Sequence, residues 1–380
     1  MNRLLFFIGL FLLLAFEILN VYFIMPMPGS QKMDSIDVAY FLYRWRWWFR
    51  IVFSILMVYG LLRSAWRRKW LPLAVIVLVV AGIYMLNFQM AADHMFYQPK
   101  KLLMVAASNN KVDTQRLIIG VVKNGIAKAY PIQYLGFHHQ VADTLAGEPI
   151  IVTYCTVCRT GRVFEPLVQG KLEKFRLVGM DHFNAMFEDV TTKSWWRQAT
   201  GEAIAGKLQG QKLPEVFSTQ TSLHEWLQLN PNSLIMQADP AYKSSYDTTF
   251  KYESGKSKSK LTGTDSLSWK DKSWVLGVKA GMNTKAYDWN KLKAQRIIMD
   301  EVGGTPIILV LAPDDKSFFA FENLPGEPRA SLAKDTLFIN EDKYRLDGSG
   351  INTSVALKRL PVSQEFWHSW RTFNPGTEVY

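Results

Sequence analysis

The sequence lacks the short motifs that most often reveal an activity. It has no glycine-rich phosphate loop, no His-Glu-X-X-His pair and no Ser-His-Asp order. It also lacks a helix-turn-helix, zinc-finger or RNA-binding signature. The formal net charge is +11, but part of the excess lies in residues 251–272, a polar segment that is typical of a solvated loop. We therefore expect no nucleic-acid partner.

Cysteine and histidine are scarce. The 380 residues include two cysteines, Cys155 and Cys158, and six histidines. Both cysteines and two of the histidines lie within residues 138–165. A site built from thiolates and imidazoles would therefore be centred on this stretch.

Long hydrophobic runs are present, all of them near the N-terminus. They cover residues 4–25, 47–62 and 70–90, and about 20 apolar residues suffice to span a bilayer. The second run is shorter and contains Arg50, whose charged end could reach the polar interface. No small-residue cleavage site follows the first run, so we predict a three-helix membrane anchor over residues 1–90 rather than a signal peptide.

The distribution of basic residues predicts the orientation of this anchor. Four lysines and arginines lie within residues 63–69, between the second and third runs. The first loop has three, which are partly balanced by aspartates. Because basic loops stay in the cytoplasm, we predict that the chain after Gln89 lies in the periplasm or exterior, with the inner membrane bilayer as a partner.

The rest of the chain contains an internal repeat. The stretch "IGVVKNGIAKAY", which ends at Tyr130, recurs as "LGVKAGMNTKAY", which ends at Tyr287. Without a gap, Asp143 then matches Asp300. Farther along, "LHEWLQLNP" resembles "FWHSWRTFNP". We predict a tandem duplication, with a connector over 91–114, a first copy over 115–231, a polar linker over 232–273 and a second copy over 274–375.

Each copy is expected to consist mainly of strands. Asn124-Gly125, Ala146-Gly147 and Gln169-Gly170 separate runs of β-branched and aromatic residues, which predicts hairpins. Each copy is expected to end in one short helix, over 222–229 and 364–372, closed by Asn-Pro. The predicted fold class is α+β, with a β-rich duplicated exterior domain after an α-helical membrane anchor.

The differences between the copies indicate where a site would be. Cys155 and Cys158 are opposite Ala312 and Asp315 in the second copy. The pair His138-His139 is opposite Gln295-Arg296. In the compared stretch, cysteine and histidine therefore occur in the first copy alone. This is expected of residues that have a chemical role rather than a role in the fold that both copies share.

Three interpretations of the cysteine pair remain open. The pair could be two packed thiols or a structural disulfide. It could exchange disulfides, since Cys-X-X-Cys lowers the pKa of one thiol, although such pairs usually begin a helix and this one follows a strand. It could also be half of a four-coordinate metal site. Covalent haem is disfavoured, because Arg159 stands where Cys-X-X-Cys-His needs histidine.

We favour the metal site, with copper or zinc as the cofactor. The predicted ligands are Cys155, Cys158, His138 or His139, and His182, which lies in the donor-rich stretch "GMDHFNAMFED". Copper is preferred outside the cytoplasm, because thiolates and thioethers suit Cu(I). The expected partner is a metal donor or an unknown small molecule. The alternatives are a thiol–disulfide oxidoreductase and a ligand-binding or sensory module without turnover.

Residues around this site also resemble a known family. The sequence contains Ala129-Tyr130-Pro131, a histidine-bearing segment from His138 to Thr144, and Val-Thr-Tyr-Cys-X-X-Cys from Val152 to Cys158. In these motifs, over about residues 115–375, it resembles the bacterial and archaeal family named domain of unknown function 3179. The residue after the family's histidine is commonly acidic and is His139 here. The resemblance implies a fold and the location of a site, and no established reaction.

Overall fold

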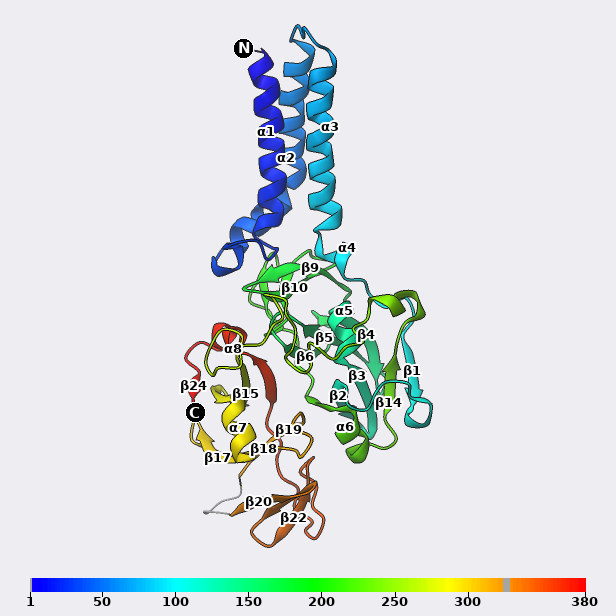
Figure 1. Ribbon diagram of the computed structural model, residues 1–380, viewed down its shortest axis with the longest axis vertical. Coiled ribbons are helices and arrows are strands. Elements are labelled where there is room, and N and C mark those ends of the chain that lie inside the picture. The colour runs from blue at the N-terminus through cyan, green and yellow to red at the C-terminus, as the bar shows by residue number, and fades with distance from the viewer. Residues whose placement is uncertain (1, 324–328) are drawn as a thin grey trace. The chain divides into compact units, whose positions relative to one another are not determined.

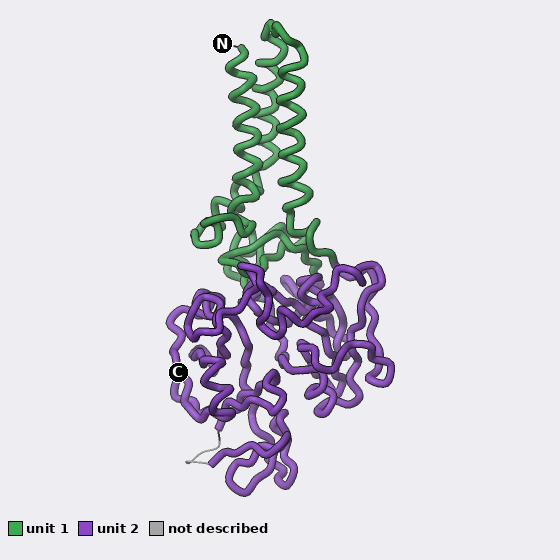
Figure 2. The backbone as a smooth tube through the Cα atoms, in the orientation of Figure 1, with its two compact units in different colours: residues 1–97, 173–197, 202–212 green, residues 98–172, 198–201, 213–380 purple. Residues whose placement is uncertain are grey.

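The computed structural model describes residues 2–323 and 329–380, which form two compact units (Figure 2). Unit 1 contains the chain up to Tyr97 together with residues 173–197 and 202–212. Unit 2 contains the remaining segments, 98–172, 198–201 and 213–380. The stretch that carries His182 therefore packs with the N-terminal helices.

Unit 1 begins with a bundle of long helices that lie side by side (Figure 1). They are α1 (Asn2–Tyr22), α2 (Ile36–Leu62) and α3 (Trp70–Tyr84), which continues into a π-helical turn, η2 (Met85–Gln89). Within the described residues, three helices are long and apolar enough to cross a membrane, as the hydrophobic runs predict. The second helix begins earlier than its apolar run, because its first turns pack on the sheet of the same unit through Tyr40 and Tyr43.

The polar residues inside the bundle bind one another. Glu17 of α1 is 1% exposed and accepts hydrogen bonds from Nε and Nη2 of Arg50 at 2.6 and 2.9 Å. The Asn87 side chain, in η2, donates to the same carboxylate at 2.9 Å. Arg50 thus forms an internal ion pair rather than reaching the interface, because a carboxylate is available one helix away.

The second part of unit 1 is a four-stranded antiparallel sheet at one end of the helices, with strand order β12-β11-β10-β9. The rings of Tyr40 and Tyr43 lie 5.0 and 5.3 Å from the ring of Trp195. The backbone N–H of Met180 donates to the carbonyl of Ile24 at 2.7 Å. Aromatic packing and a main-chain bond therefore join the sheet to the helices. The elements are η1 (Ser30–Lys32), α4 (Ala92–Met95), β9 (Phe175–Asp181), β10 (Asn184–Asp189), β11 (Trp195–Arg197) and β12 (Ala203–Ala205).

The first half of unit 2 contains a five-stranded sheet, in the order β1-β14-β3-β2-β13, and a three-stranded sheet, β4-β5-β6. Within the larger sheet, β14 and β3 are parallel and the other neighbours antiparallel. The elements are β1 (Leu103–Ala106), η3 (Ala107–Asn109), β2 (Leu117–Lys123), β3 (Ile126–Pro131), α5 (Ile132–His138), β4 (Gln140–Leu145), β5 (Glu148–Cys155), β6 (Thr160–Phe164), β7 (Leu167–Val168), β8 (Lys171–Leu172), β13 (Ser218–Ser222), α6 (Leu223–Leu229), β14 (Leu234–Gln237) and η4 (Pro240–Ser245).

The second half of unit 2 has a four-stranded sheet in the order β23-β15-β16-β24, in which β16 and β24 are parallel. Two three-stranded sheets, β17-β18-β19 and β20-β21-β22, complete it. The elements are β15 (Trp274–Ala280), β16 (Asn283–Asp288), α7 (Trp289–Gln295), β17 (Ile297–Val302), β18 (Thr305–Leu311), β19 (Phe318–Glu322), β20 (Ala330–Ala333), β21 (Thr336–Ile339), β22 (Asp342–Arg345), β23 (Val362–Phe366), α8 (Trp367–Phe373) and β24 (Glu378–Val379).

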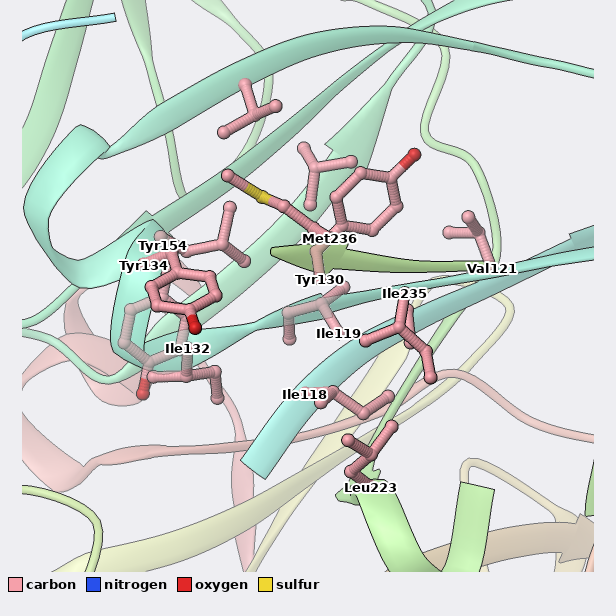
Figure 3. Close-up of a cluster of buried hydrophobic side chains, with 14 of the residues drawn as sticks. Ile118, Ile119, Val121, Tyr130, Ile132, Tyr134, Tyr154, Leu223, Ile235 and Met236 are labelled. Atoms are coloured by element: carbon pink, nitrogen blue, oxygen red, sulfur yellow. The ribbon is translucent and has the colours of Figure 1, made fainter. Parts of the chain in front are cut away.

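Each half encloses its own hydrophobic core. In the first half, Ile118 and Val121 of β2, Tyr130 of β3 and Tyr154 of β5 gather with Ile235 of β14 (Figure 3). The Tyr130 hydroxyl donates to Asp143 Oδ2 at 2.6 Å, so its polar end is satisfied inside the core. In the second half, Tyr287 donates in the same way to Asp300 Oδ2 at 2.9 Å.

A tryptophan packs on a glycine in each half. A Cβ added to Gly120 would lie 2.3 Å from the Trp226 ring of α6, and one added to Gly277 would lie 2.1 Å from the Trp370 ring of α8. Neither site has room for a methyl group. These glycines are therefore required by close packing of the short helix on its sheet.

Gly120→Ala and Gly277→Ala should each destabilise unit 2. Overpacking a core usually costs about 1–3 kcal/mol, and contacts this short place both variants at the upper end of that range. Thermal unfolding of the purified chain measures the loss. The control is Gly125→Ala in the β2–β3 turn, where an added Cβ meets nothing within 4 Å and only the positive φ of 77° opposes it. Equal unfolding temperatures for the three variants would contradict the packing argument.

The expected secondary structure is largely present, with two differences. The Asn124-Gly125 and Ala146-Gly147 hairpins form as predicted. The helices α5 and α7, which follow β3 and β16, were not predicted from the sequence. The last helix begins at Trp367 rather than Gln364, because residues up to Phe366 pair with β15 as strand β23.

Candidate functional site

The two cysteines lie at the turn between β5 and β6. Cys155 is the last residue of β5, and Cys158 belongs to the turn that leads into β6 at Thr160. The strand–turn–strand setting predicted from the sequence is therefore confirmed. Both side chains are thiols with no exposed surface. Burial and the neighbouring Cys155 sulfur raise the pKa of the Cys158 thiol well above its usual value, so Cys158 is a neutral thiol near pH 7.

A histidine from the second half of unit 2 faces this turn. Nε2 of His368, in the first turn of α8, lies 3.8 Å from Sγ of Cys158. The backbone N–H of Phe366 donates to the carbonyl of Cys158 at 2.9 Å and fixes the start of α8 against the turn. The imidazole and thiol are 210 residues apart in sequence and meet through the contact between the two halves.

The hydrogen bonding of His368 determines its tautomer. Nδ1 lies 2.9 Å from the carbonyl oxygen of Asp271, which can only accept, so Nδ1 carries the proton. Burial, assisted by the charge of Lys272, lowers the pKa of His368 to about 4. The ring is therefore neutral near pH 7, and the lone pair of Nε2 points towards the Cys158 sulfur.

Two cationic side chains lie close to the cysteines. Lys272 Nζ donates to the carbonyls of Val157 and Leu261 at 2.7 Å each and interacts electrostatically with both thiols. Arg159, which follows Cys158, has no exposed surface, and its guanidinium lies 4.0 Å from the centre of the Trp274 ring. The charge of Lys272 acts to lower the pKa of the Cys158 thiol, but burial outweighs it.

A buried ion pair supports the same region. Arg162 of β6 donates from Nη2 to Glu365 Oε1 at 2.6 Å, and the two side chains are 5% and 1% exposed. Thr160 and Ser369 donate to the other oxygen of Glu365 at 3.1 and 2.9 Å. The pair ties β6 to β23 and so positions the turn and α8 that carry Cys158 and His368.

The predicted histidines have other surroundings. Nε2 of His138 lies 2.8 Å from the hydroxyl of Tyr246, and His139 is buried, with its pKa lowered by burial to about 4. His182 belongs to unit 1, where Nδ1 is 2.7 Å from Asp181 and Nε2 is 3.2 Å from Asp34. Its bond to Asp181 raises the pKa of His182. Among residues 2–323 and 329–380, no group of three or more His, Cys, Asp or Glu side chains is arranged to hold a metal ion.

His368 is the residue that sequence reasoning missed. It has no cysteine or second histidine nearby in sequence. Comparing the two repeated stretches position by position does not show which residues of one contact the other. A signal existed: His368 and His224 occupy the same position of the two short helices, one residue after the start of the helix in the "LHEW" and "WHSW" segments. His224 is exposed, whereas His368 is buried against the turn of the other half.

Comparison with known proteins agrees with the motif resemblance. The family described as "Protein of unknown function (DUF3179)" matches residues 99–377. The chain belongs to this family. No curated protein and no solved structure matches the chain.

Proposed function

We propose that Cys155 and Cys158 hold a single Cu(I) ion, with His368 as the third donor in place of the predicted histidines. The observation that carries this proposal is the 3.8 Å distance between Cys158 Sγ and His368 Nε2. For bond lengths of about 2.3 Å to sulfur and 2.0–2.1 Å to nitrogen, two donors at about 120° on one metal are roughly 3.8 Å apart. The two atoms thus have the spacing of ligands in a trigonal site.

The outer contacts of His368 also suit a ligand. A histidine that binds metal usually donates its other ring N–H to a carbonyl or carboxylate, which fixes the ring and the tautomer. His368 donates from Nδ1 to the carbonyl of Asp271 at 2.9 Å. The Nε2 lone pair faces the cysteine and accepts from the Cys158 thiol at 3.8 Å.

The local charge favours a monovalent ion over zinc. Two thiolates and Cu(I) carry a net charge of −1, which the buried Lys272 balances. Zn²⁺ with the same donors would be neutral and would not balance the charge of the buried Lys272, which is costly. Cu(I) can be held by two or three soft donors. Because no group of three His, Cys, Asp or Glu side chains is arranged to hold a metal ion among the described residues, the proposal requires the donors to move together when the ion binds.

Burial favours a metal over thiol–disulfide exchange. Thiol–disulfide exchange requires a thiolate of the protein to reach a sulfur atom in the disulfide of its substrate. Neither cysteine has exposed surface, and the pKa of Cys158 is raised by burial. A single ion needs far less access than a protein disulfide does. The experiment must therefore exclude the alternative function, that of a thiol–disulfide oxidoreductase.

The proposed setting is an exterior domain held at the membrane by three spanning helices. The basic loop at 63–69 supports this orientation. A tandem duplication over about 115–231 and 274–375 accounts for the paired tyrosine–aspartate bonds and the paired glycine–tryptophan contacts. In this proposal the first copy supplies the thiols and the second copy supplies the imidazole.

Elemental analysis of the full chain, purified from membranes without chelators, tests the metal site. The wild type should contain about one copper per chain. Cys155→Ser and Cys158→Ser should lose it, because a hydroxyl is a poor ligand for Cu(I). His368→Ala should weaken copper binding by at least the roughly 10–100-fold that loss of an outer contact costs, measured by competition with a Cu(I) chelator.

The matched control is His224→Ala, at the same helix position in the first copy. It should retain copper, as should His182→Ala in unit 1. Equal copper in the Cys155→Ser variant and the wild type would contradict the proposal. A metal-free wild type whose cysteines cycle through a disulfide would replace it with the oxidoreductase.

A further inference from the structure

Unit 1 contains a cavity that the proposed copper site does not use. It has a volume of about 1060 Å³ and lies between the ends of the three long helices and the strands β9 and β10. Its walls combine apolar side chains, such as Leu13, Ile24 and Leu86, with arginine, lysine and tyrosine side chains. A cavity of this size and mixed lining is suited to a small amphiphilic molecule.

The position of this cavity along the helices is marked by aromatic residues. Trp45, Trp47 and Trp48 of α2 are 48%, 61% and 64% exposed, and Trp47 also lines the cavity. Tryptophans gather where a membrane meets water. If the helices span the bilayer, the cavity therefore lies at the level of the lipid headgroups, on the side of the β9–β12 sheet.

The cavity has cations that no carboxylate neutralises. Arg50 pairs with Glu17, and Arg176 pairs with Asp93 and Glu188. Arg44, Arg46 and Lys193 also line the cavity, but none of the three forms an ion pair within the described residues. Three cations without a paired carboxylate beside an apolar wall favour an anionic ligand with a hydrocarbon part.

A buried polar atom in the cavity indicates a second property of the ligand, a hydrogen-bond donor. Asn20 of α1 lines the cavity and is 7% exposed, and its Oδ1 has no hydrogen-bond partner among the described residues. A buried acceptor without a donor is costly, so a ligand that brings a hydroxyl group would relieve it. A phosphate alone cannot do so, because ionised phosphate oxygens accept hydrogen bonds.

We propose that this cavity binds the headgroup of an anionic glycerophospholipid of the phosphatidylglycerol type. The phosphate lies near Arg44 and Lys193, a headgroup hydroxyl donates to Asn20, and the acyl chains follow the apolar wall into the bilayer. The proposal depends on the membrane anchor and is independent of the copper site.

Lipid retention by the full chain tests this site. The chain is exchanged into nanodiscs of equal parts phosphatidylglycerol and phosphatidylcholine, extracted with mild detergent, and its bound lipid is identified by native mass spectrometry. The wild type should retain phosphatidylglycerol in preference. Loss of both cations in Arg44→Ala/Lys193→Ala should lower that preference roughly 30-fold, at about tenfold per 1.4 kcal/mol and about 1 kcal/mol per basic residue.

Two further variants separate the parts of the proposal. Arg67→Ala/Arg68→Ala removes two exposed cations from the loop at the other end of the helices and should leave retention unchanged. Asn20→Leu should abolish the preference for phosphatidylglycerol over phosphatidic acid while keeping that for anionic over neutral lipid.

Several outcomes would overturn the site. They are equal retention of the two lipids by the wild type, an unchanged preference in Arg44→Ala/Lys193→Ala, or equal loss in the Arg67→Ala/Arg68→Ala control. Thermal stabilisation by soluble glycerol phosphate equal to that by the lipid would assign the cavity to a soluble anion instead. Copper content, measured on the same samples, tests the proposed copper site separately from the lipid site.

Discussion

Replacement of Glu17 by glutamine should destabilise the helical bundle by about 3–5 kcal/mol, the usual cost of breaking a buried ion pair. Glu17 is 1% exposed and accepts two hydrogen bonds from Arg50 and one from Asn87. The neutral amide would leave the Arg50 guanidinium uncompensated among apolar helices, where charge is costly. The unfolding midpoint in detergent should fall, and α1 should become more accessible to protease.

The control for this result is removal of both charges together. Glu17→Leu with Arg50→Met leaves no buried charge, and such replacements are often neutral or stabilising. Asp37→Asn, at the exposed first turn of α2, should cost only a few tenths of a kcal/mol. A Glu17→Gln variant as stable as Asp37→Asn would show that the pair does not support the bundle.

The second large effect is expected at the ion pair between β6 and β23. Glu365→Gln should cost about 3 kcal/mol of stability in unit 2, the lower end of the usual range for breaking a buried pair, because it removes the 2.6 Å partner of Arg162 and leaves the more exposed Glu215 carboxylate at 3.4 Å. At the proposed copper site the affinity should fall as well, because the pair holds the two elements that carry Cys158 and His368. Chemical denaturation followed by tryptophan fluorescence measures the loss.

The same variant should change the dependence of stability on pH. Burial raises the pKa of Glu365, but Arg162 and the Ser369 and Ser363 hydroxyls outweigh it, so the pKa lies below its ordinary value. Stability from this carboxylate is therefore fully present above the unfolded pKa of about 4.3 and is lost as the pH falls through the lower folded value. In Glu365→Gln, this loss of stability at acidic pH should be smaller than in the wild type.

An exposed glutamate provides the comparison for Glu365. Glu322 pairs with Lys358 at 2.5 Å, and the two side chains are 36% and 74% exposed. Surface pairs of this kind contribute about 0–1 kcal/mol. Glu322→Gln should therefore leave both the stability and its loss at acidic pH nearly unchanged. Identical pH profiles for Glu365→Gln and the wild type would rule out the assigned role of the buried pair.

Features governed by local chemistry could be predicted from the sequence. Asn124 and Gly125 adopt φ angles of 50° and 77°, which asparagine and glycine tolerate, and the hairpin forms there. The apolar runs become long helices because their composition alone suits a membrane. The turn at Cys155 and Cys158 follows from a strand-forming run on each side.

Features that depend on distant contacts could not be predicted. The helix α5 is only seven residues long, and its tyrosine, leucine and isoleucine side chains fit a strand as well as a helix. The position of His368 depends on contact between the two halves of unit 2, which no spacing of residues within one half encodes. The same holds for residues 173–197, which pack with helices far earlier in the chain.

X-ray absorption at the copper edge tests whether Cys155, Cys158 and His368 bind copper. The sample is the full chain, purified from membranes under anaerobic conditions. We expect one Cu(I) bound to two sulfur atoms at about 2.3 Å and one nitrogen at about 2.0–2.1 Å, with the nitrogen contribution lost in His368→Ala. A chain without copper, in which Cys155 and Cys158 form a reversible disulfide, would contradict it.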